Sequence, residues 1–213
     1  MERFFKTEAV VLLTNDFGDA NRVVTFFTKN YGKIEANAYG CRRAKNKISG
    51  AMQVFNHISL EFIKGNIYTV HEADVISFYK INEDLNRLAY ASVFFEIVNR
   101  MTVLEEVDTE VFYLLLKSLE AFDKRNPRIA LLLSTCQFIE LSGFSIKYPE
   151  SMRNLFLTLS HFDWKDTSKF VLKSGELFEA ESFLMNYIQS DFDISLNSLK
   201  FLKMINSIDK INK

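Results

Sequence analysis

The apolar residues of this 213-residue chain follow one spacing up to about residue 80 and a different spacing after it. Before that point apolar and polar residues alternate over short segments. In Lys33–Ala38, for example, Ile34, Ala36 and Ala38 would share one face of a strand. After it, apolar residues recur every three or four positions, which is the spacing of one helix face. The sequence therefore predicts a β-rich N-terminal region followed by a helical region.

Strand-like segments fill the first 80 residues, and turn residues separate most of them. The cluster Asn15–Asp19 ends the first segment, and Lys64-Gly65-Asn66 is typical of a hairpin turn. Five short strands joined by turns and one longer loop predict a small closed barrel of the OB type. The expected strands are Thr7–Thr14, Arg22–Thr28, Lys33–Ala38, Val54–Ile63 and Ile67–Ala73.

The helical region contains several amphipathic segments with their own start and stop residues. Asn82 is expected to cap the first helix and Asp108 or Thr109 the second, because short polar side chains accept hydrogen bonds from N–H groups at a helix start. Pro127 and Gly143 would bound a third helix. Expected helices cover about 85–99, 109–123, 128–142, 152–160, 180–189 and 196–208, with a brief strand at Lys169–Lys173. We predict an α+β chain of two domains: a five-stranded OB-type β-barrel at 1–80 and an all-α helical domain at 81–213.

The positive charge of the chain is concentrated in one segment. The whole chain has a formal net charge of −1, but residues 22–64 contain eight Lys or Arg residues against two Glu residues, a local net charge of +6. Such an excess is typical of a surface that binds phosphate. A solvated surface loop is the alternative explanation.

Several classes of function find no support in the sequence. It contains no nucleophile elbow, phosphate-binding glycine loop, dinucleotide fingerprint or HExxH pattern. The two cysteines, Cys41 and Cys136, have no CxxC partner, which argues against a zinc site and a disulfide framework. No signal peptide and no uncharged run long enough to span a bilayer is evident. We expect a cytoplasmic protein that is not an enzyme, needs no cofactor or metal and does not enter a membrane.

The segment Lys33–Gly50 carries the most functional information. It leads from a strand through Tyr39 and Gly40 into the basic run Arg42-Arg43-Ala44-Lys45-Asn46-Lys47. At the mouth of a barrel such a loop would offer cations to a sugar-phosphate backbone, and nearby aromatic residues would offer faces for stacking bases. Tyr39 and Phe27 are the nearest aromatic residues, and Phe27 also suits the barrel core.

Several motifs resemble the RecO family of bacterial recombination and repair mediators. The run from Asp16 to Thr28 with Tyr31-Gly32-Lys33-Ile34 is similar to the start of that family, and Ala38–Arg43 is similar to its small-x-Gly-small-Arg-Arg stretch. The resemblance extends to further positions: Gly50 with Gln53 and Phe55; Asp84-Leu85; Ala89-Tyr90-Ala91 with Glu96; Gly143-Phe144; and Asn197–Leu202.

The chain also departs from the family pattern. Many RecO proteins hold zinc with four cysteines after the helix that ends in this Gly-Phe pair, whereas Ser145–Lys173 contains no cysteine. The resemblance therefore implies a shortened form without the zinc site. Tyr39 stands where the family often has lysine, and Asn46 where it often has serine.

The resemblance implies a protein that binds single- and double-stranded DNA without sequence preference and anneals complementary strands. It would also remodel single-strand-binding protein (SSB) so that RecA can load, acting with RecR, in the cytoplasm at the nucleoid. The expected DNA contacts are Arg22, Lys33, Tyr39, Arg42, Arg43, Lys45 and Lys47.

In the family, the helical domain receives the acidic, apolar C-terminal tail of SSB. Phe122, Lys124, Arg125 and Arg128 are the candidates here, with a solvated interhelical loop as the alternative. Two other functions stay open: a protein-interaction adaptor without direct DNA contact, and an RNA-binding OB protein.

Overall fold

The computed structural model describes residues 4–164 and 172–211. Its contacts divide the chain into two compact units. The barrel unit comprises Met1–Tyr79 with Met101–Leu116, and the helical unit comprises Lys80–Arg100 with Lys117–Lys213. A closed five-stranded barrel followed by helices confirms the predicted fold class. The expected strand at Lys169–Lys173 falls mostly on 165–171, outside the described residues.

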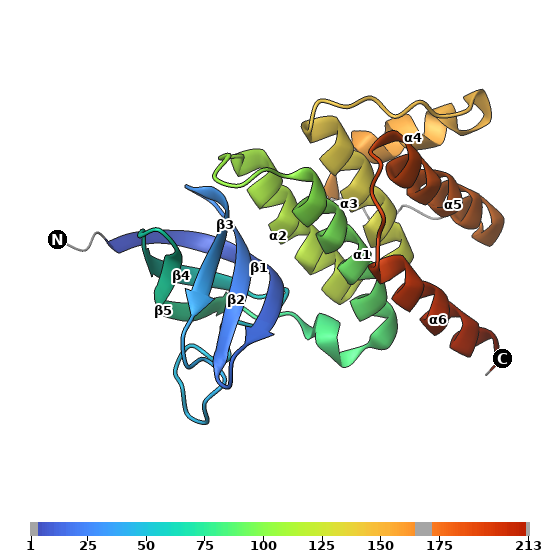
Figure 1. Cartoon of the computed structure of the whole chain (residues 1–213). Coiled ribbons are helices and arrows are strands. Elements are labelled where there is room, and N and C mark those ends of the chain that lie inside the picture. The colour runs from blue at the N-terminus through green and yellow to red at the C-terminus, as the bar shows by residue number, and fades with distance from the viewer. Residues whose placement is uncertain (1–3, 165–171, 212–213) are drawn as a thin grey trace. The chain divides into compact units, whose positions relative to one another are not determined.

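The strands of the barrel unit follow the order β1-β2-β3-β5-β4 around the barrel (Figure 1). Only β3 and β5 pair in parallel, while the other neighbours are antiparallel. This order and the closure are those expected of the OB type. The strands are β1 (Phe4–Phe17), β2 (Asn21–Thr28), β3 (Gly32–Ala38), β4 (His57–Ile63) and β5 (Tyr68–Ser77).

Strand β1 is longer than predicted because it serves two neighbours. Its first part, Phe4–Val10, pairs with β4, and its second part pairs with β2 as far as Phe17. The β1–β2 register shifts between Val11 and Leu13. Such an irregularity bends a strand and increases its twist, which lets one strand take part in both halves of a barrel.

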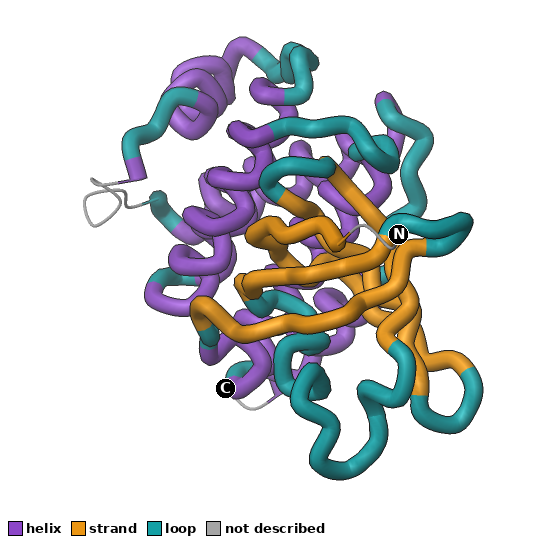
Figure 2. Tube along the Cα trace, turned by 90° about the vertical axis from the view of Figure 1, so that its left-hand side faces the viewer, coloured by secondary structure: helices purple, strands orange, loops and turns teal. Residues whose placement is uncertain are grey.

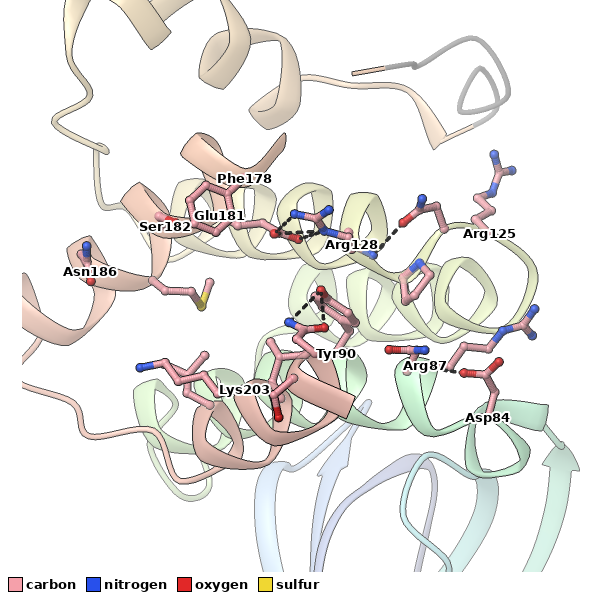
Figure 3. A pocket seen from close by; sticks show the side chains of 18 of the residues that line it. Asp84, Arg87, Tyr90, Arg125, Arg128, Phe178, Glu181, Ser182, Asn186 and Lys203 are labelled. Carbon is pink, nitrogen blue, oxygen red and sulfur yellow. Dashed lines mark hydrogen bonds and ion pairs between the residues drawn. The ribbon is translucent and has the colours of Figure 1, made fainter. Parts of the chain in front are cut away.

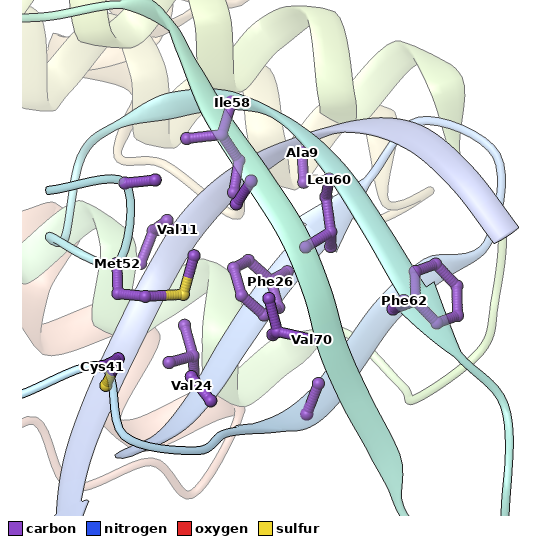
Figure 4. Packing of buried hydrophobic residues seen from close by; sticks show 14 of the residues in the cluster. Ala9, Val11, Val24, Phe26, Cys41, Met52, Ile58, Leu60, Phe62 and Val70 are labelled. Carbon is purple, nitrogen blue, oxygen red and sulfur yellow. The ribbon is translucent and has the colours of Figure 1, made fainter. Parts of the chain in front are cut away.

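Alternate residues of the strands fill the barrel interior (Figure 4). Val24 and Phe26 of β2 meet Leu60 of β4 and Val70 of β5 there, and all four are buried. Because successive side chains on a strand point to opposite faces, the period-2 pattern of the sequence becomes this core.

Residues 101–106 lie against the start of β3. The backbone N–H of Glu105 donates to the carbonyl of Lys33 at 2.8 Å, and Lys33 also forms a parallel bridge with Leu104. Gly32 has a φ of +66°, and a Cβ at this position would lie 2.0 Å from the Glu106 carbonyl oxygen. Only glycine fits here, because both the backbone angle and the close approach exclude a side chain.

The helices are α1 (Leu85–Met101), α2 (Thr109–Lys124), α3 (Pro127–Leu141), α4 (Arg153–Ser160), α5 (Ser174–Asp191) and α6 (Ser198–Ile211), with short 3₁₀ turns at Lys80–Glu83 and Glu150–Met152. In the helical unit the ring of Phe94 lies 6.2 Å from that of Phe122 and 6.3 Å from that of Phe138. These buried rings come from α1, α2 and α3 and form the centre of the unit. Figure 2 shows the helices in purple and the strands in orange.

One of the two predicted helix caps is confirmed, and a further cap, Asn126, was not predicted. Asp108 accepts hydrogen bonds from the N–H groups of Glu110 and Val111, and Asn126 accepts one from Arg128 N–H. The expected cap at Asn82 is wrong. Asp84 accepts from Arg87 N–H at 2.9 Å instead, because residues 80–83 form a 3₁₀ turn and α1 begins at Leu85.

One glutamine holds the segment that follows α4 in sequence. The side-chain amide of Gln137 on α3 donates to the carbonyls of Leu159 and Phe162, at 3.4 and 2.8 Å. Its oxygen accepts from the Trp164 indole N–H at 2.6 Å. These three contacts connect α3 to residues 159–164.

The start of helix α6 is capped by the carboxylate of Glu96, a residue of α1. Glu96 accepts hydrogen bonds from the N–H groups of Asn197 and Ser198, at 3.1 and 2.8 Å, and from the Ser198 hydroxyl. Arg100 pairs with the same carboxylate at 3.0 Å. Burial raises the pKa of Glu96, but these hydrogen bonds outweigh it and hold the pKa below the ordinary 4.5. The contact caps the free N–H groups at the start of α6.

No helix within the described residues is long and apolar enough to cross a membrane.

We predict that Gly32→Ala destabilises the barrel unit by more than about 1 kcal/mol, because the left-handed backbone and the Glu106 carbonyl both oppose a methyl group. The thermal unfolding midpoint measures this effect. Gly50→Ala is the control, since nothing lies within 4 Å of the Cβ it would add. Equal midpoints for the two variants would contradict the prediction.

We predict that Glu96→Gln lowers the stability of the helical unit by about 1 kcal/mol at neutral pH, the usual value of a lost helix cap. Because the pKa of Glu96 is lowered on folding, its contribution is complete above the ordinary value of 4.5 and is lost as the pH falls through the lower folded value. Urea unfolding followed by circular dichroism should therefore show a gap between native protein and variant that closes in acid. A gap that persists well below pH 4.5 would show that the carboxylate charge is not its source.

Candidate nucleic-acid interface

The loop between β3 and β4, residues 39–56, is ordered by its own contacts. Cys41 and Met52 are buried in the barrel core, so the apolar residues of the loop close one end of the barrel. The side-chain amide of Asn46 donates to the Gly40 carbonyl at 2.9 Å, and its oxygen accepts from Ile48 N–H at 3.0 Å. Figure 1 shows the loop extending from the same end of the barrel as the β1–β2 turn. With its apolar residues inside, the loop presents its basic residues to solvent.

Three cations of the loop are exposed and lack an acidic partner among the described residues. Arg43, Lys45 and Lys47 are all exposed. Within the part of the chain that the structure describes, no carboxylate lies in ion-pair distance of any of them. An unneutralised cluster of this kind attracts phosphate.

Two further arginines, Arg22 on β2 and Arg42 in the loop itself, share one carboxylate. The Nε of Arg22 on β2 lies 2.8 Å from Oδ1 of Asp16, and the Nε of Arg42 lies 3.3 Å from Oδ2. The hydrogen bond from Arg22 and the nearby charge of Arg42 hold the pKa of Asp16 below its ordinary value, so this side chain is ionised at neutral pH. Five of the expected phosphate contacts thus belong to one end of the barrel: Arg22, Arg42, Arg43, Lys45 and Lys47.

An aromatic pair adjoins these cations. Tyr39 is 53% exposed, and its ring lies 6.1 Å from that of Phe17, edge to face. The Tyr39 hydroxyl accepts a hydrogen bond from the Asn37 amide at 3.0 Å. The sequence pattern places Phe17 in a turn, and Phe17 is not among the predicted contacts. An aromatic residue next to Gly18 at the end of a strand is the signal that could have indicated it.

Two other residues considered for this surface lie elsewhere. Phe27 is buried. Lys33 is only 8% exposed, and its Nζ donates to the Thr102 carbonyl. Burial lowers the pKa of Lys33. The β2–β3 register places Lys33 opposite Phe27, whereas Arg22 lies opposite Ala38 at the far end of β3. The structure therefore does not bring Lys33 together with the loop cations.

The helical unit contains a pocket of about 1000 Å³ (Figure 3). It is formed by α1, α3, α5 and α6 with the α2–α3 connection, and its apolar lining includes Tyr90, Phe178, Met185, Leu199 and Leu202. Side-chain amides and hydroxyls make up much of the rest, among them Asn86, Asn126, Asn186, Gln189 and Asn206. This mixture suits a short peptide with both apolar and polar groups better than a purely apolar ligand.

Two of the four residues proposed for a peptide site line this pocket. Arg125 extends from its rim, and Arg128 lies inside, held by Glu181 with Nε–Oε distances of 3.0 and 3.1 Å. Lys124 does not line the pocket and pairs with Glu120 on the same helix. Phe122 is fully buried, so it supports the core and cannot touch a bound peptide.

Two pocket cations were missed by the sequence analysis. Arg87 comes from α1 and Lys203 from α6, and both line the pocket. Arg87 donates to the backbone carbonyl of Asp123. Residues so far apart in the chain meet only through helix packing, and no local pattern indicates it.

The described residues contain no group of three or more His, Cys, Asp or Glu side chains placed to hold a metal ion.

Comparison with known proteins matches both parts of the chain to the same protein family. Residues 1–79 match the family model "Recombination protein O N terminal", and residues 82–148 match "Recombination protein O C terminal". A stretch of 146 residues is 32% identical to the DNA repair protein RecO of Caldanaerobacter subterraneus subsp. tengcongensis, covering 67% of this chain and 59% of that protein.

Two further relatives carry the same name. Over 146 residues the chain is 34% identical to the protein of Acetivibrio thermocellus, covering 67% of this chain and 58% of that protein. It is 24% identical to the protein of Caldicellulosiruptor bescii over 219 residues, or 99% of this chain and 84% of that protein. The matched stretch thus spans about three fifths of the first two relatives.

Proposed function

This chain belongs to the RecO family of DNA repair proteins, and we propose that it binds DNA through the basic end of its barrel without sequence preference. On this proposal it anneals complementary single strands and, with RecR, helps RecA to load onto single-stranded DNA covered by SSB. It does so as a binding protein and not as an enzyme.

The observation that carries the proposal is that exposed cations belong to the same barrel end as two aromatic rings, the exposed ring of Tyr39 and the half-buried ring of Phe17. Arg43, Lys45 and Lys47 supply charge that no described carboxylate neutralises, and Tyr39 and Phe17 supply ring faces beside them. Cations that follow a backbone and rings that stack on bases are the two parts of sequence-independent single-strand binding. Neither part distinguishes one base from another, which suits annealing of any complementary pair.

We predict that Arg43→Ala/Lys45→Ala/Lys47→Ala weakens binding of a labelled single-stranded oligonucleotide. It should also flatten the plot of log K against log salt by about 2, because each phosphate contact contributes about 0.7 on single strands. Fluorescence anisotropy over a salt series measures both quantities. The control removes three exposed lysines of the helical unit, Lys117→Ala/Lys147→Ala/Lys200→Ala.

The alternatives give different results in the same assay. A protein-interaction adaptor would bind DNA weakly, and both triple variants would show the same small loss of DNA affinity. An RNA-binding protein would release a DNA probe to an RNA competitor of equal length and sequence far more readily than to DNA. Either result would contradict the proposal.

We also propose that the pocket of the helical unit receives the acidic, apolar C-terminal tail of SSB. Leu199, Leu202 and Met185 offer an apolar floor, and Arg125 and Lys203 offer exposed cations at the edge. Arg128 is the weaker candidate for direct contact, because Glu181 already neutralises it. Charge at a rim around an apolar floor is the usual arrangement for such a peptide.

We predict that Arg125→Glu weakens binding of a labelled SSB-tail peptide roughly tenfold, about 1.4 kcal/mol, because the reversed charge repels the acidic tail. The matched control is Lys124→Glu, the same change one residue away on a side chain that does not line the pocket. Peptide titration by anisotropy measures both. Equal losses in the two variants would point to a general charge effect and remove the pocket from the proposal.

A further inference from the structure

One carboxylate of the barrel stands between two of its arginines. Asp16 of β1 lies 2.8 Å from Nε of Arg22 and 3.3 Å from Nε of Arg42, through different oxygens. All three side chains are accessible, with exposed fractions of 48% for Asp16, 27% for Arg22 and 37% for Arg42. The group therefore lies on the surface that a nucleic acid would approach.

The backbone fixes this arrangement. Asp16 and Arg22 are directly opposed in the β1–β2 register, where cross-strand side chains meet. The N–H of Arg42 donates to the carbonyl of Ala20 in the β1–β2 turn at 3.0 Å, which brings the basic loop to the same place. Strand pairing and loop closure thus bring together the backbone positions that carry these three charges.

The basic end therefore contains two classes of cation. Arg43, Lys45 and Lys47 have no carboxylate within ion-pair distance among the described residues, whereas Arg22 and Arg42 share one. A phosphodiester can bind the first class directly. To bind the second, it must displace or approach an ionised carboxylate, which takes the same guanidinium donors and repels the phosphate.

We propose that Asp16 competes with the phosphodiester backbone for Arg22 and Arg42 and thereby sets how tightly the barrel holds a DNA strand. This inference rests on the proposed DNA binding. Arg43, Lys45 and Lys47 make the lasting contacts with DNA. Arg22 and Arg42 contact it only when phosphate replaces the Asp16 carboxylate. A protein that brings strands together and then passes them on must release them, and an internal competitor weakens the bound state without removing any cation.

The first test is Asp16→Asn, which keeps the size of the side chain and removes its charge. We expect single-stranded DNA to bind roughly threefold to fivefold more tightly at low salt, the size of one nearby like-charge repulsion in a watery environment. The salt dependence should steepen by about 0.7 for each additional phosphate engaged. The control is Asp19→Asn in the β1–β2 turn, because Asp19 makes no ion pair with any described residue. It changes the net charge equally.

The second test is Arg42→Ala in the native and the Asp16→Asn backgrounds. Competition predicts a small loss of affinity in the native background and a loss several times larger once Asp16 is neutral. Arg43→Ala should reduce DNA affinity by the same factor in both backgrounds. These paired measurements separate competition at Arg42 from a general increase in positive charge.

The outcomes distinguish this inference from the function on which it rests. If the native protein and the Asp16→Asn variant both fail to bind DNA, the proposed function is wrong and the inference fails with it. If DNA binds through the loop but Asp16→Asn matches Asp19→Asn, or weakens binding, competition by Asp16 is overturned while the proposed function stands. Tighter binding by Asp16→Asn alone, with Arg42→Ala more harmful in that background, supports it.

Discussion

The barrel unit depends on one strand that pairs with two neighbours. β1 meets β4 over its first half and β2 over its second, and the irregularity between Val11 and Leu13 gives it the bend that this requires. Closure leaves an apolar interior, and Cys41 and Met52 of the β3–β4 loop are buried in it. The same long strand carries Asp16 to a position opposite Arg22. The barrel core, the position of the β3–β4 loop and the charged end of the barrel thus all follow from the pairing of β1 with β2 and β4.

Burial decides what each cation of the barrel unit can do. Arg43, Lys45 and Lys47 lie on a loop whose apolar residues point inward, so their charges remain in water and open to a polyanion. Lys33, by contrast, donates to a backbone carbonyl of residues 101–106, and desolvation lowers its pKa. Together with Gly32 it attaches that segment to β3. The Gly-Lys turn of the motif is therefore explained by packing, whereas the basic residues of the loop keep their charges in solvent.

The local sequence pattern predicted the strands and helices well. It predicted the roles of single residues correctly in some cases and wrongly in others. The strands and helices form where the apolar residues have the matching spacing, because this spacing determines which face of each element is buried. Asn82 was expected as a cap, yet the chain forms a 3₁₀ turn there and Asp84 takes the role. Phe122 suited a peptide site by its position beside cations, but its helix turns it into the core. In both cases the side chain's direction depends on packing that a short window does not contain.

The sequence by itself determined a five-stranded barrel followed by helices, a basic loop at the barrel end and a resemblance to RecO, because periodicity, turn residues and charge are local properties. Only the tertiary structure decided which charges meet. It placed Asp16 between Arg22 and Arg42, paired Phe17 with Tyr39, set Glu181 against Arg128 and brought Arg87 and Lys203 to one pocket. The physical reason is that electrostatic and ring contacts depend on distance in space, which strand register and helix packing set after the chain has folded.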